Sequence, residues 1–477
     1  MTISDTIKPL ENELIISAID AYMHRNSFER VGDTYVHRTH TNNGMGGYNH
    51  SRVVTMTAPG SDGEGGGVCV GVSDYGVAPQ WYTDVYGKEF DNIRSRIRSA
   101  IGVFHSVRKH TAFDATCQSL VDFVDKLDVH KDSSIGMGED GLLGAIMQAE
   151  NCVSWIFDGA AFNELRQKVL PEVRRGILAY WATGGCLLAN LRSEQAMMKR
   201  AEESVINAIE SATSACDVIA SKSNNGGGAV ILTIISLAVS VADLASTAMG
   251  VTTPMGAAQL IGGMSELGLK TIKDRGLADA ADKFFEKPGS DVYAVISELE
   301  RSLTKINEEC TKVEKEITAV LKDSISEMVR PGARHKYDLN ITPNVSSDFA
   351  SKKLTIQNTN EAYNLSDSVI PLLGTLMEKY AADLMKIQFA RPLVRGSGFA
   401  LGPGGCAPKL IELQALLYQL MIDFGNEVGD YAYNLRCAID AVIATDQDSA
   451  AALAKIDASA EYQRQNKKNP WAYYDKK

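Results

Sequence analysis

Apolar residues recur at intervals of three and four over unusually long stretches of this chain. The longest stripe comprises Leu165, Val169, Val173, Ile177, Tyr180, Gly184, Leu187, Leu191, Met198, Ala201, Val205, Ala208 and Ala212. This period places apolar side chains on one face of an α-helix. Proline is tolerated in the first turn of a helix, so Pro171 predicts a start near Leu170 and one very long helix to about Ser221.

Two later regions repeat this kind of pattern. Between Val292 and Ser324 the apolar residues form two heptad sets, with Glu and Lys on the flanks: Val292, Leu299, Ile306, Val313 and Val320, and Ile296, Leu303, Cys310 and Ile317. Heptads of this kind predict a coiled-coil-like helix. A C-terminal helical hairpin is expected next, with one arm from about Asn364 to Phe389 and a second from Leu410 to Val442, joined by a Gly-rich turn.

The N-terminal part is more varied. A short amphipathic helix is expected from about Leu10 to Met23, and helices from about Asp84 to Leu127, with a break near His110, and from about 141 to 154. Between them lies a Gly-rich stretch at 41–79. Two β-branched runs lie within it, 52–57 and 68–72, and either a small β-hairpin or an irregular loop fits them.

We therefore predict an all-α fold, an elongated bundle of long antiparallel helices with coiled-coil character, an apolar central helical hairpin and a small Gly-rich N-terminal loop that could contain β-structure. Few aromatics, 7% of residues, favour helix-on-helix packing. The predicted units are 1–130 with the loop 41–79, a hairpin at 139–222, the apolar hairpin at 226–290, the heptad helix at 291–330, the C-terminal hairpin at 361–458 and a tail at 459–477.

The apolar centre is the least polar part of the chain. Residues 226–242 carry no charge, and Asp243 is the only charged residue as far as Met264. A membrane-spanning helix needs about twenty apolar residues, and small residues allow close helix packing. A hairpin over 229–273 could insert in a membrane or lie in the core of the bundle, and both interpretations stay open. Its membrane-facing candidates are Ile231, Ile235, Leu237, Val241, Leu260 and Ile261.

The motifs of common enzyme classes are absent from the sequence. It contains no P-loop, GxSxG or HExxH motif, and its glycine runs lack the strand-to-helix context of a dinucleotide-binding or phosphate-binding loop. His37, His40 and His50 lie near the Gly-rich stretch, but no further ligand has diagnostic spacing, so we interpret them as polar loop residues. We predict no enzyme, no catalytic or cofactor-binding residues, no cofactor and no metal site.

The net charge and the cysteine pattern further restrict the kinds of partner and of folding environment. The formal net charge of −11 argues against a nucleic-acid partner, which would need a concentrated basic face. The eight cysteines lie far apart without a CxxC pattern, and most fall in apolar helical stretches. We expect buried thiols rather than a disulfide framework, and folding in a reducing cytoplasm. The first twenty residues do not have the pattern of a Sec signal peptide.

Residues 143–203 resemble the WXG-like helical-hairpin proteins exported by type VII (ESX) secretion systems. In that family a Trp and a Gly lie in the turn between two helices, where Trp wedges between the helices and Gly permits a tight reversal. Trp155, Gly159 and Phe162 resemble this turn, although three residues separate Trp155 from Gly159 instead of one. The pattern from Leu187 to Gln195 also resembles the second helix of the family.

Residues 365–456 resemble the EspC-like branch of the same secreted hairpins. Such substrates carry an export signal of Tyr and an acidic residue four positions later. Here Val442 stands in place of the Tyr and Asp446 matches the acid, so the signal is degenerate. The resemblance implies a non-enzymatic protein, made in the cytoplasm and secreted or surface-associated without a Sec signal peptide, that acts by contact with a protein partner, by self-association or by contact with a membrane.

Two other functions fit the same helices. An α-helical pore-forming toxin component also places an apolar hairpin between long bundle helices, as 229–273 lies between the two longest predicted helices. A cytoplasmic helical scaffold would keep the apolar hairpin in its core. The sequence alone does not decide among these functions.

Overall fold

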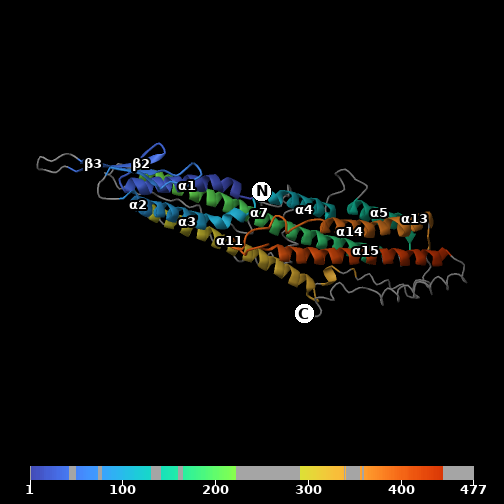
Figure 1. Cartoon of the computed structure of the whole chain (residues 1–477). Helices are drawn as coiled ribbons and strands as arrows, with labels where there is room; N and C mark the ends of the chain where they lie inside the picture. Colours follow the sequence, from blue (N-terminus) through green and yellow to red (C-terminus); the bar gives the residue numbers. More distant parts are fainter. Residues whose placement is uncertain are drawn as a thin grey trace.

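The computed structural model describes residues 2–41, 50–73, 78–129, 141–158, 165–221, 291–332, 334–337, 339, 355–356 and 359–443. Of these residues, 77% are helical, and the strands form a small antiparallel sheet and one short two-stranded pairing. The prediction of a mostly helical protein is confirmed at this level. The sheet lies at one end of the molecule and helices α5 and α13 lie at the other (Figure 1).

Three long helices run along a common direction (Figure 1). They are α7 (Leu170–Ser221), α11 (Val292–Val329) and α15 (Ala407–Ile443). Helix α7 starts where the sequence predicts, because Pro171 needs no backbone N–H partner in a first turn. A π-helical turn, η4 (Leu165–Val169), precedes it.

Shorter helices cover the half of α7 that is nearer the sheet. Helix α1 (Ser4–Arg25) packs along α7, and α3 (Lys88–Gly102) packs on both α1 and α11. The predicted break near His110 consists of two 3₁₀ turns, η2 (Val103–Ser106) and η3 (His110–Phe113), which lead into α4 (Asp114–Leu127). In the half of α7 farther from the sheet, Gly184 allows α4 to approach closely, because a Cβ there would lie 3.0 Å from the Phe123 ring.

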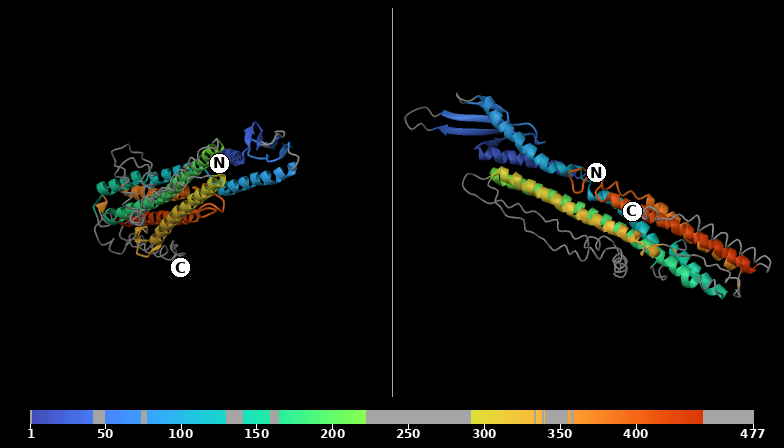
Figure 2. Two further views of the ribbon diagram at one scale, coloured as in Figure 1. Left: turned by 90° about the vertical axis from the view of Figure 1, so that its left-hand side faces the viewer. Right: turned by 90° about the horizontal axis from the view of Figure 1, so that it is seen from below.

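The other half contains the C-terminal helices and α5 (Leu142–Ile156) (Figure 2). The chain enters through α13 (Thr359–Asn364), the π-helical turn η7 (Leu365–Val369) and α14 (Ile370–Met385), which packs along α15. Gly374 allows α14 and α15 to pack closely, since a Cβ at this position would lie 2.7 Å from the backbone oxygen of Gly425.

Four strands form the sheet in the order β1 (Glu29–Val31), β2 (Thr34–Thr41), β3 (His50–Thr57) and β4 (Cys69–Val72), all antiparallel. The pairing of β3 with β4 confirms the hairpin alternative for the two β-branched runs. Strands β1 and β2 were not predicted. These two strands contain few buried residues. One of them, Tyr35, lies in the core formed by helices α1 and α3. A second pairing joins β5 (Phe157–Asp158) to β6 (Thr355–Ile356).

The heptad pattern of α11 drifts towards its C-terminal end. Its apolar positions are buried from Val292 to Ile317, but Val320 is only half-buried and Leu321 is buried in its place. A straight α-helix has 3.6 residues per turn, so a strict seven-residue repeat rotates away from the interface after a few turns. Beyond Val320 the second heptad set continues through Ser324, while the first set shifts by one residue to Leu321 and Met328.

The apolar hairpin at 229–273, the tail at 459–477 and the Gly-rich residues 42–49 lie outside the described residues. None of the described helices is both long and apolar enough to cross a membrane. All eight cysteines fall within the described part of the chain and are free, and five of them are buried. The expectation of buried thiols is therefore confirmed for the majority.

Candidate functional site

Helices α7 and α11 form an antiparallel pair that runs through the middle of the molecule. Near the start of α7, the Tyr180 hydroxyl donates to the backbone oxygen of Tyr337, beyond the end of α11, at 2.6 Å. Further along α7, the Cys186 thiol lies 3.5 Å from the Ser324 hydroxyl. As residue numbers rise along α7 they fall along α11, so the last turn of α7 lies at the same end as the first turn of α11.

The first turn of α11 is held at the sheet end by polar and aromatic contacts. Asp291 caps the helix by accepting from the backbone N–H of Ala294 at 2.9 Å, and it pairs with Arg25 of α1 at 2.9 Å. The hydrogen bond from Arg25 lowers the pKa of the Asp291 carboxyl. The Tyr293 ring meets the Tyr22 ring edge-on at 6.3 Å. The chain therefore leaves α7 and enters α11 beside the sheet.

A cluster of charged residues lies buried where the two halves of the molecule meet. We call Glu194, Glu314, Arg395 and Cys406 the central ion cluster. Arg395 comes from the loop between α14 and α15, and its Nη1 donates to Glu194 Oε1 at 2.9 Å while its Nη2 pairs with Glu314. The side chains of Arg395, Glu194 and Glu314 are at most 1% exposed.

The loop 386–406 is tied to both long helices through this cluster. Glu314 accepts from the backbone N–H groups of Leu401 at 2.8 Å and Cys406 at 3.1 Å. Two turns earlier on α11, Asn307 donates to the Gly398 oxygen at 2.9 Å and accepts from the Ala400 N–H at 2.8 Å. Side chains of α11 thus bind four backbone groups of the loop, of which the Cys406 N–H is buried.

Gly405 makes room for the cluster. Its φ is +46°, in the left-handed region, and a Cβ there would overlap with the Arg395 guanidinium and the Glu314 carboxylate. Any other residue would force the ion pair apart and also strain the backbone.

The cluster holds two carboxylates and one guanidinium. Burial raises the pKa of the Glu194 carboxyl, and the positive charge of Arg395 opposes this shift without cancelling it. Burial also raises the pKa of the Cys406 thiol well above its usual value, so the thiol is neutral. A proton on Glu194 leaves the cluster electrically neutral, which is the favourable state in a medium of low dielectric constant.

The same residues could in principle bind a metal ion. The ligand atoms of Glu194, Glu314 and Cys406 all lie within 4.8 Å of one another. The Arg395 guanidinium, however, pairs with both carboxylates and so takes the place that a cation would need, and a neutral thiol is a poor ligand. The residues present do not fit a metal ion.

One residue of this cluster stands out in the sequence. Glu194 stands three residues after Leu191, within the apolar stripe of α7, where a charged residue needs a buried partner. Its partner could not be found from the sequence, because Arg395 comes from a loop without periodicity.

The residues predicted as sites are dispersed. Trp155 lies in α5 and Val442 in the last turn of α15, while Gly159, Phe162, Asp446 and all six membrane-facing candidates of the apolar hairpin lie outside the described residues. Among the histidines of the Gly-rich region, His37 and His40 lie on β2 and His50 on β3. The His37 ring packs against Phe28 at 5.1 Å, and its Nδ1 lies 3.0 Å from the backbone oxygen of Ser27.

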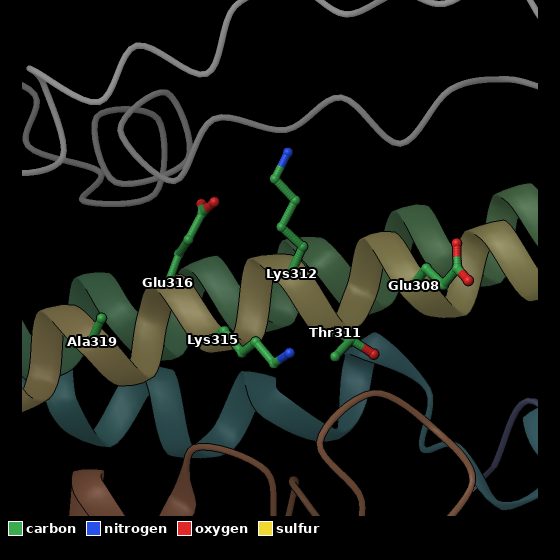
Figure 3. A pocket seen from close by; sticks show the side chains of 6 residues that line it. All are labelled: Glu308, Thr311, Lys312, Lys315, Glu316 and Ala319. Atoms are coloured by element: carbon green, nitrogen blue, oxygen red, sulfur yellow. The ribbon is translucent and has the colours of Figure 1, made fainter.

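A shallow hollow of about 530 Å³ lies on the outer face of α11 (Figure 3). Its lining comes from one helix: Glu308, Thr311, Lys312, Lys315, Glu316 and Ala319. The lysine and glutamate side chains point in different directions and do not converge on one point (Figure 3). This face is the charged flank that the heptad pattern predicts, and it forms no binding site by itself.

Comparison of the chain with protein-family models, with curated proteins and with solved structures found no match.

Proposed function

We propose that this chain is a non-enzymatic, membrane-acting helical protein of the pore-forming kind, in which α7 and α11 form a two-helix stalk and the apolar residues 229–273 insert into the bilayer. The antiparallel register of α7 and α11 carries the proposal. Because Ser221 ends one helix and Asp291 precedes the other at the same end of the molecule, the connecting segment leaves and re-enters the stalk at one place.

The composition of the connecting segment supports the proposal. Seventeen consecutive residues, 226–242, carry no charge, and one charge occurs as far as Met264. About twenty apolar residues are needed to cross a bilayer as a helix, and small residues such as Gly, Ala, Ser and Thr let two such helices pack closely.

The proposal includes an elongated bundle in which α7 and α11 pack in coiled-coil fashion. The loop 386–406 clasps this pair through the central ion cluster, which would hold the protein in its water-soluble form. A clasp made of buried ion pairs is sensitive to the loss of one partner, since the remaining charge is then buried alone.

Release of a dye from liposomes tests the proposal. We expect the purified full chain to release the dye, and Leu237→Asp to abolish release, because a charge at the centre of a bilayer costs roughly 3 kcal/mol or more. Leu372→Asp is the matched control, since this side chain is exposed on α14 in the other half of the molecule. Intact liposomes with the wild-type protein, or equal release by both variants, would count against it.

A type VII secretion substrate is the second candidate. The pairing of α14 with α15 as a helical hairpin favours it, as does the packing of α5 against η4 and α7. In this proposal the protein is made in the cytoplasm and exported to the surface or the medium, where it acts by contact with a protein partner or with a second copy.

The location of the tagged protein in its host, with and without the type VII motor ATPase, tests the second candidate. Export that depends on the ATPase would support it. Retention in the cytosol of both strains, with secreted controls behaving normally, would favour an intracellular helical scaffold. Trp155→Ala adds a structural test, because truncation of a wedge residue between helices should cost about 3–5 kcal/mol of stability.

A further inference from the structure

A serine, a histidine and a glutamate form a hydrogen-bonded series where α1 meets η2. The Ser4 hydroxyl, in the first turn of α1, lies 3.0 Å from Nδ1 of the His105 ring. Nε2 of the same ring lies 2.7 Å from Oε2 of Glu11, two turns further along α1. These residues belong neither to the central ion cluster nor to the segment proposed to insert into the bilayer, so their chemistry can be tested separately.

Glu11 determines which ring nitrogen of His105 carries the proton. A carboxylate only accepts hydrogen bonds, and this one lies beside Arg98, whose Nε is 3.6 Å from Oε1. Nε2 of His105 therefore carries the proton and donates to Glu11. Nδ1 keeps its lone pair and accepts from the Ser4 hydroxyl. The Glu11 side chain is only 7% exposed, so water does not displace it from the ring.

Backbone contacts hold the two segments together independently of these side chains. The Ile3 N–H donates to the Val107 oxygen at 2.9 Å, and Thr2 forms a β-bridge with Arg108. Attachment of α1 to η2 therefore does not depend on the bond between the serine and the histidine. The same contacts fix the positions of the hydroxyl and the ring relative to each other.

The first turn of α1 also offers backbone donors beside Ser4. The N–H groups of Thr6 and Ile7 both donate to the Ile3 oxygen, at 2.9 and 3.0 Å. Within the described part of the chain, the N–H groups of Ser4 and Asp5 have no backbone acceptor. Free N–H groups at the start of a helix favour negative charge, including the oxyanion that forms when a nucleophile adds to a carbonyl group.

Solvent reaches both the hydroxyl and the ring. Ser4 is partly exposed, and the His105 side chain is 30% exposed. A small carbonyl compound can therefore approach the hydroxyl from solution, while the buried carboxylate keeps the ring oriented.

We propose that Ser4 is a reactive nucleophile and an acylation site, with His105 as its general base and Glu11 as the residue that orients the base. A nucleophile bonded to a base, which is oriented in turn by a third group, is the arrangement that activates serine for acyl transfer. The reactant is an activated acyl compound, such as an aryl ester or a thioester.

The proposed reaction transfers an acyl group to Ser4. The Ser4 oxygen adds to the carbonyl carbon of an ester while its proton passes to Nδ1 of His105. The N–H groups of Ser4 and Asp5 would stabilise the oxyanion. Departure of the alcohol breaks the ester C–O bond, and His105 returns the proton to the leaving oxygen. The acyl group stays on Ser4 as an ester, so a single event modifies the chain without turnover.

A fluorophosphonate probe and p-nitrophenyl acetate, each applied to the purified full chain, test the proposal. We expect one phosphonyl group per chain, located on Ser4 by peptide mass spectrometry, and an initial burst of one equivalent of p-nitrophenolate. Ser4→Ala should lose both. His105→Gln should slow the labelling of Ser4 about a hundredfold or more, since a positioned general base contributes about 10²–10⁴-fold.

Two matched controls carry the same chemical changes elsewhere. His110 also lies 3.0 Å from a carboxylate, that of Glu202, and its side chain is 32% exposed, so His110→Gln removes a similar pair. Ser119→Ala removes an exposed hydroxyl from α4. Both controls should be labelled at the wild-type rate. Far-UV circular dichroism and thermal unfolding establish that each variant is folded.

Glu11→Gln tests the orienting role of the carboxylate. An amide can donate as well as accept, so it no longer fixes the proton on Nε2 of His105. We expect labelling of Ser4 to be at least about tenfold slower. The nitrogen-15 NMR signals of the His105 ring should also change, because they report which nitrogen is protonated. A purely structural role of Glu11 would leave both the labelling rate and these signals of the folded variant unchanged.

Several results would overturn the proposal. They are labelling spread over many residues, a wild type that reacts no faster than Ser4→Ala, and labelling of Ser4 that is equally fast in His105→Gln. Release of p-nitrophenolate that continues after the burst, and is lost in the same variants, would support the nucleophile and show that water removes the acyl group.

Discussion

Arg395 donates from Nη1 to Oε1 of Glu194 over 2.9 Å, and both side chains are almost completely buried although 201 residues separate them in the chain. This ion pair joins the loop of the C-terminal hairpin to the longest helix. Glu314 of α11 completes the contact, so three segments that are distant in sequence meet at one buried point. The stability of the whole assembly should therefore depend on a few side chains.

Loss of the Arg395 side chain should be strongly destabilising. Arg395→Met removes the cation that Glu194 and Glu314 share and leaves a buried negative charge unpaired, so we expect the free energy of unfolding to fall by about 3–5 kcal/mol. Urea unfolding monitored by circular dichroism measures this change. Arg330→Met is the control, because the Arg330 side chain is 61% exposed and its ion pair with Glu327 should contribute less than about 1 kcal/mol. Equal losses in the two variants would contradict the role of the cluster.

Glu194 should make stability depend on pH. Burial raises the pKa of this carboxyl above its ordinary value of 4.5, so the folded protein binds the proton more tightly than the unfolded chain does. The free energy of unfolding should then fall as pH rises above that value, until the pH exceeds the raised pKa.

Replacement of this carboxyl by an amide gives the matched comparison. Glu194→Gln cannot titrate, so its stability should fall less over the same pH window, as measured by urea unfolding at a series of pH values. Glu210→Gln, an exposed position on the same helix, should follow the wild type. The prediction fails if the wild type and Glu194→Gln have parallel pH profiles.

The contact between α14 and α15 should not tolerate a methyl group at Gly374. A Cβ there would lie 2.7 Å from the Gly425 backbone oxygen, which cannot move aside as a side chain can. Gly374→Ala should lower the free energy of unfolding by about 1–3 kcal/mol.

Another glycine of the same hairpin provides the control. A Cβ at Gly429, inside α15, would meet no atom within 4 Å, so Gly429→Ala should stabilise the helix by up to about 1 kcal/mol. Thermal unfolding of the two variants measures the difference. A pair of alanine variants that melt at the same temperature would show that the two helices are not this close.

Thiol reactivity should report the burial of the cysteines. Cys69, Cys152 and Cys437 are partly exposed and the other five are buried. Burial raises the pKa of Cys117 to about 11 and those of Cys216 and Cys310 to about 12, so these thiols carry almost no reactive thiolate at neutral pH. A colorimetric thiol reagent should modify at most three thiols rapidly in the native protein and eight in denaturant. Rapid modification of six or more would refute the packing.

The helix boundaries that could be predicted follow from local sequence patterns. Apolar spacing and Pro171 placed the start of α7 at Leu170, and the heptads placed the start of α11 at Val292. The β-branched runs indicated β3 and β4 but not β1 and β2. A strand next to glycine-rich loops carries little signal of its own, and its position depends on the helices that cover it.

The sequence by itself determined where the long helices lie, because helical periodicity repeats every few residues and needs no knowledge of the rest of the chain. Tertiary structure alone decided that Glu194, Glu314 and Arg395 meet, and that α7 ends at the same end of the molecule as the start of α11. Contacts of this kind depend on helix register and on loop conformation across hundreds of residues. A buried charge shows in the sequence that a partner is needed, and only the fold shows which residue provides it.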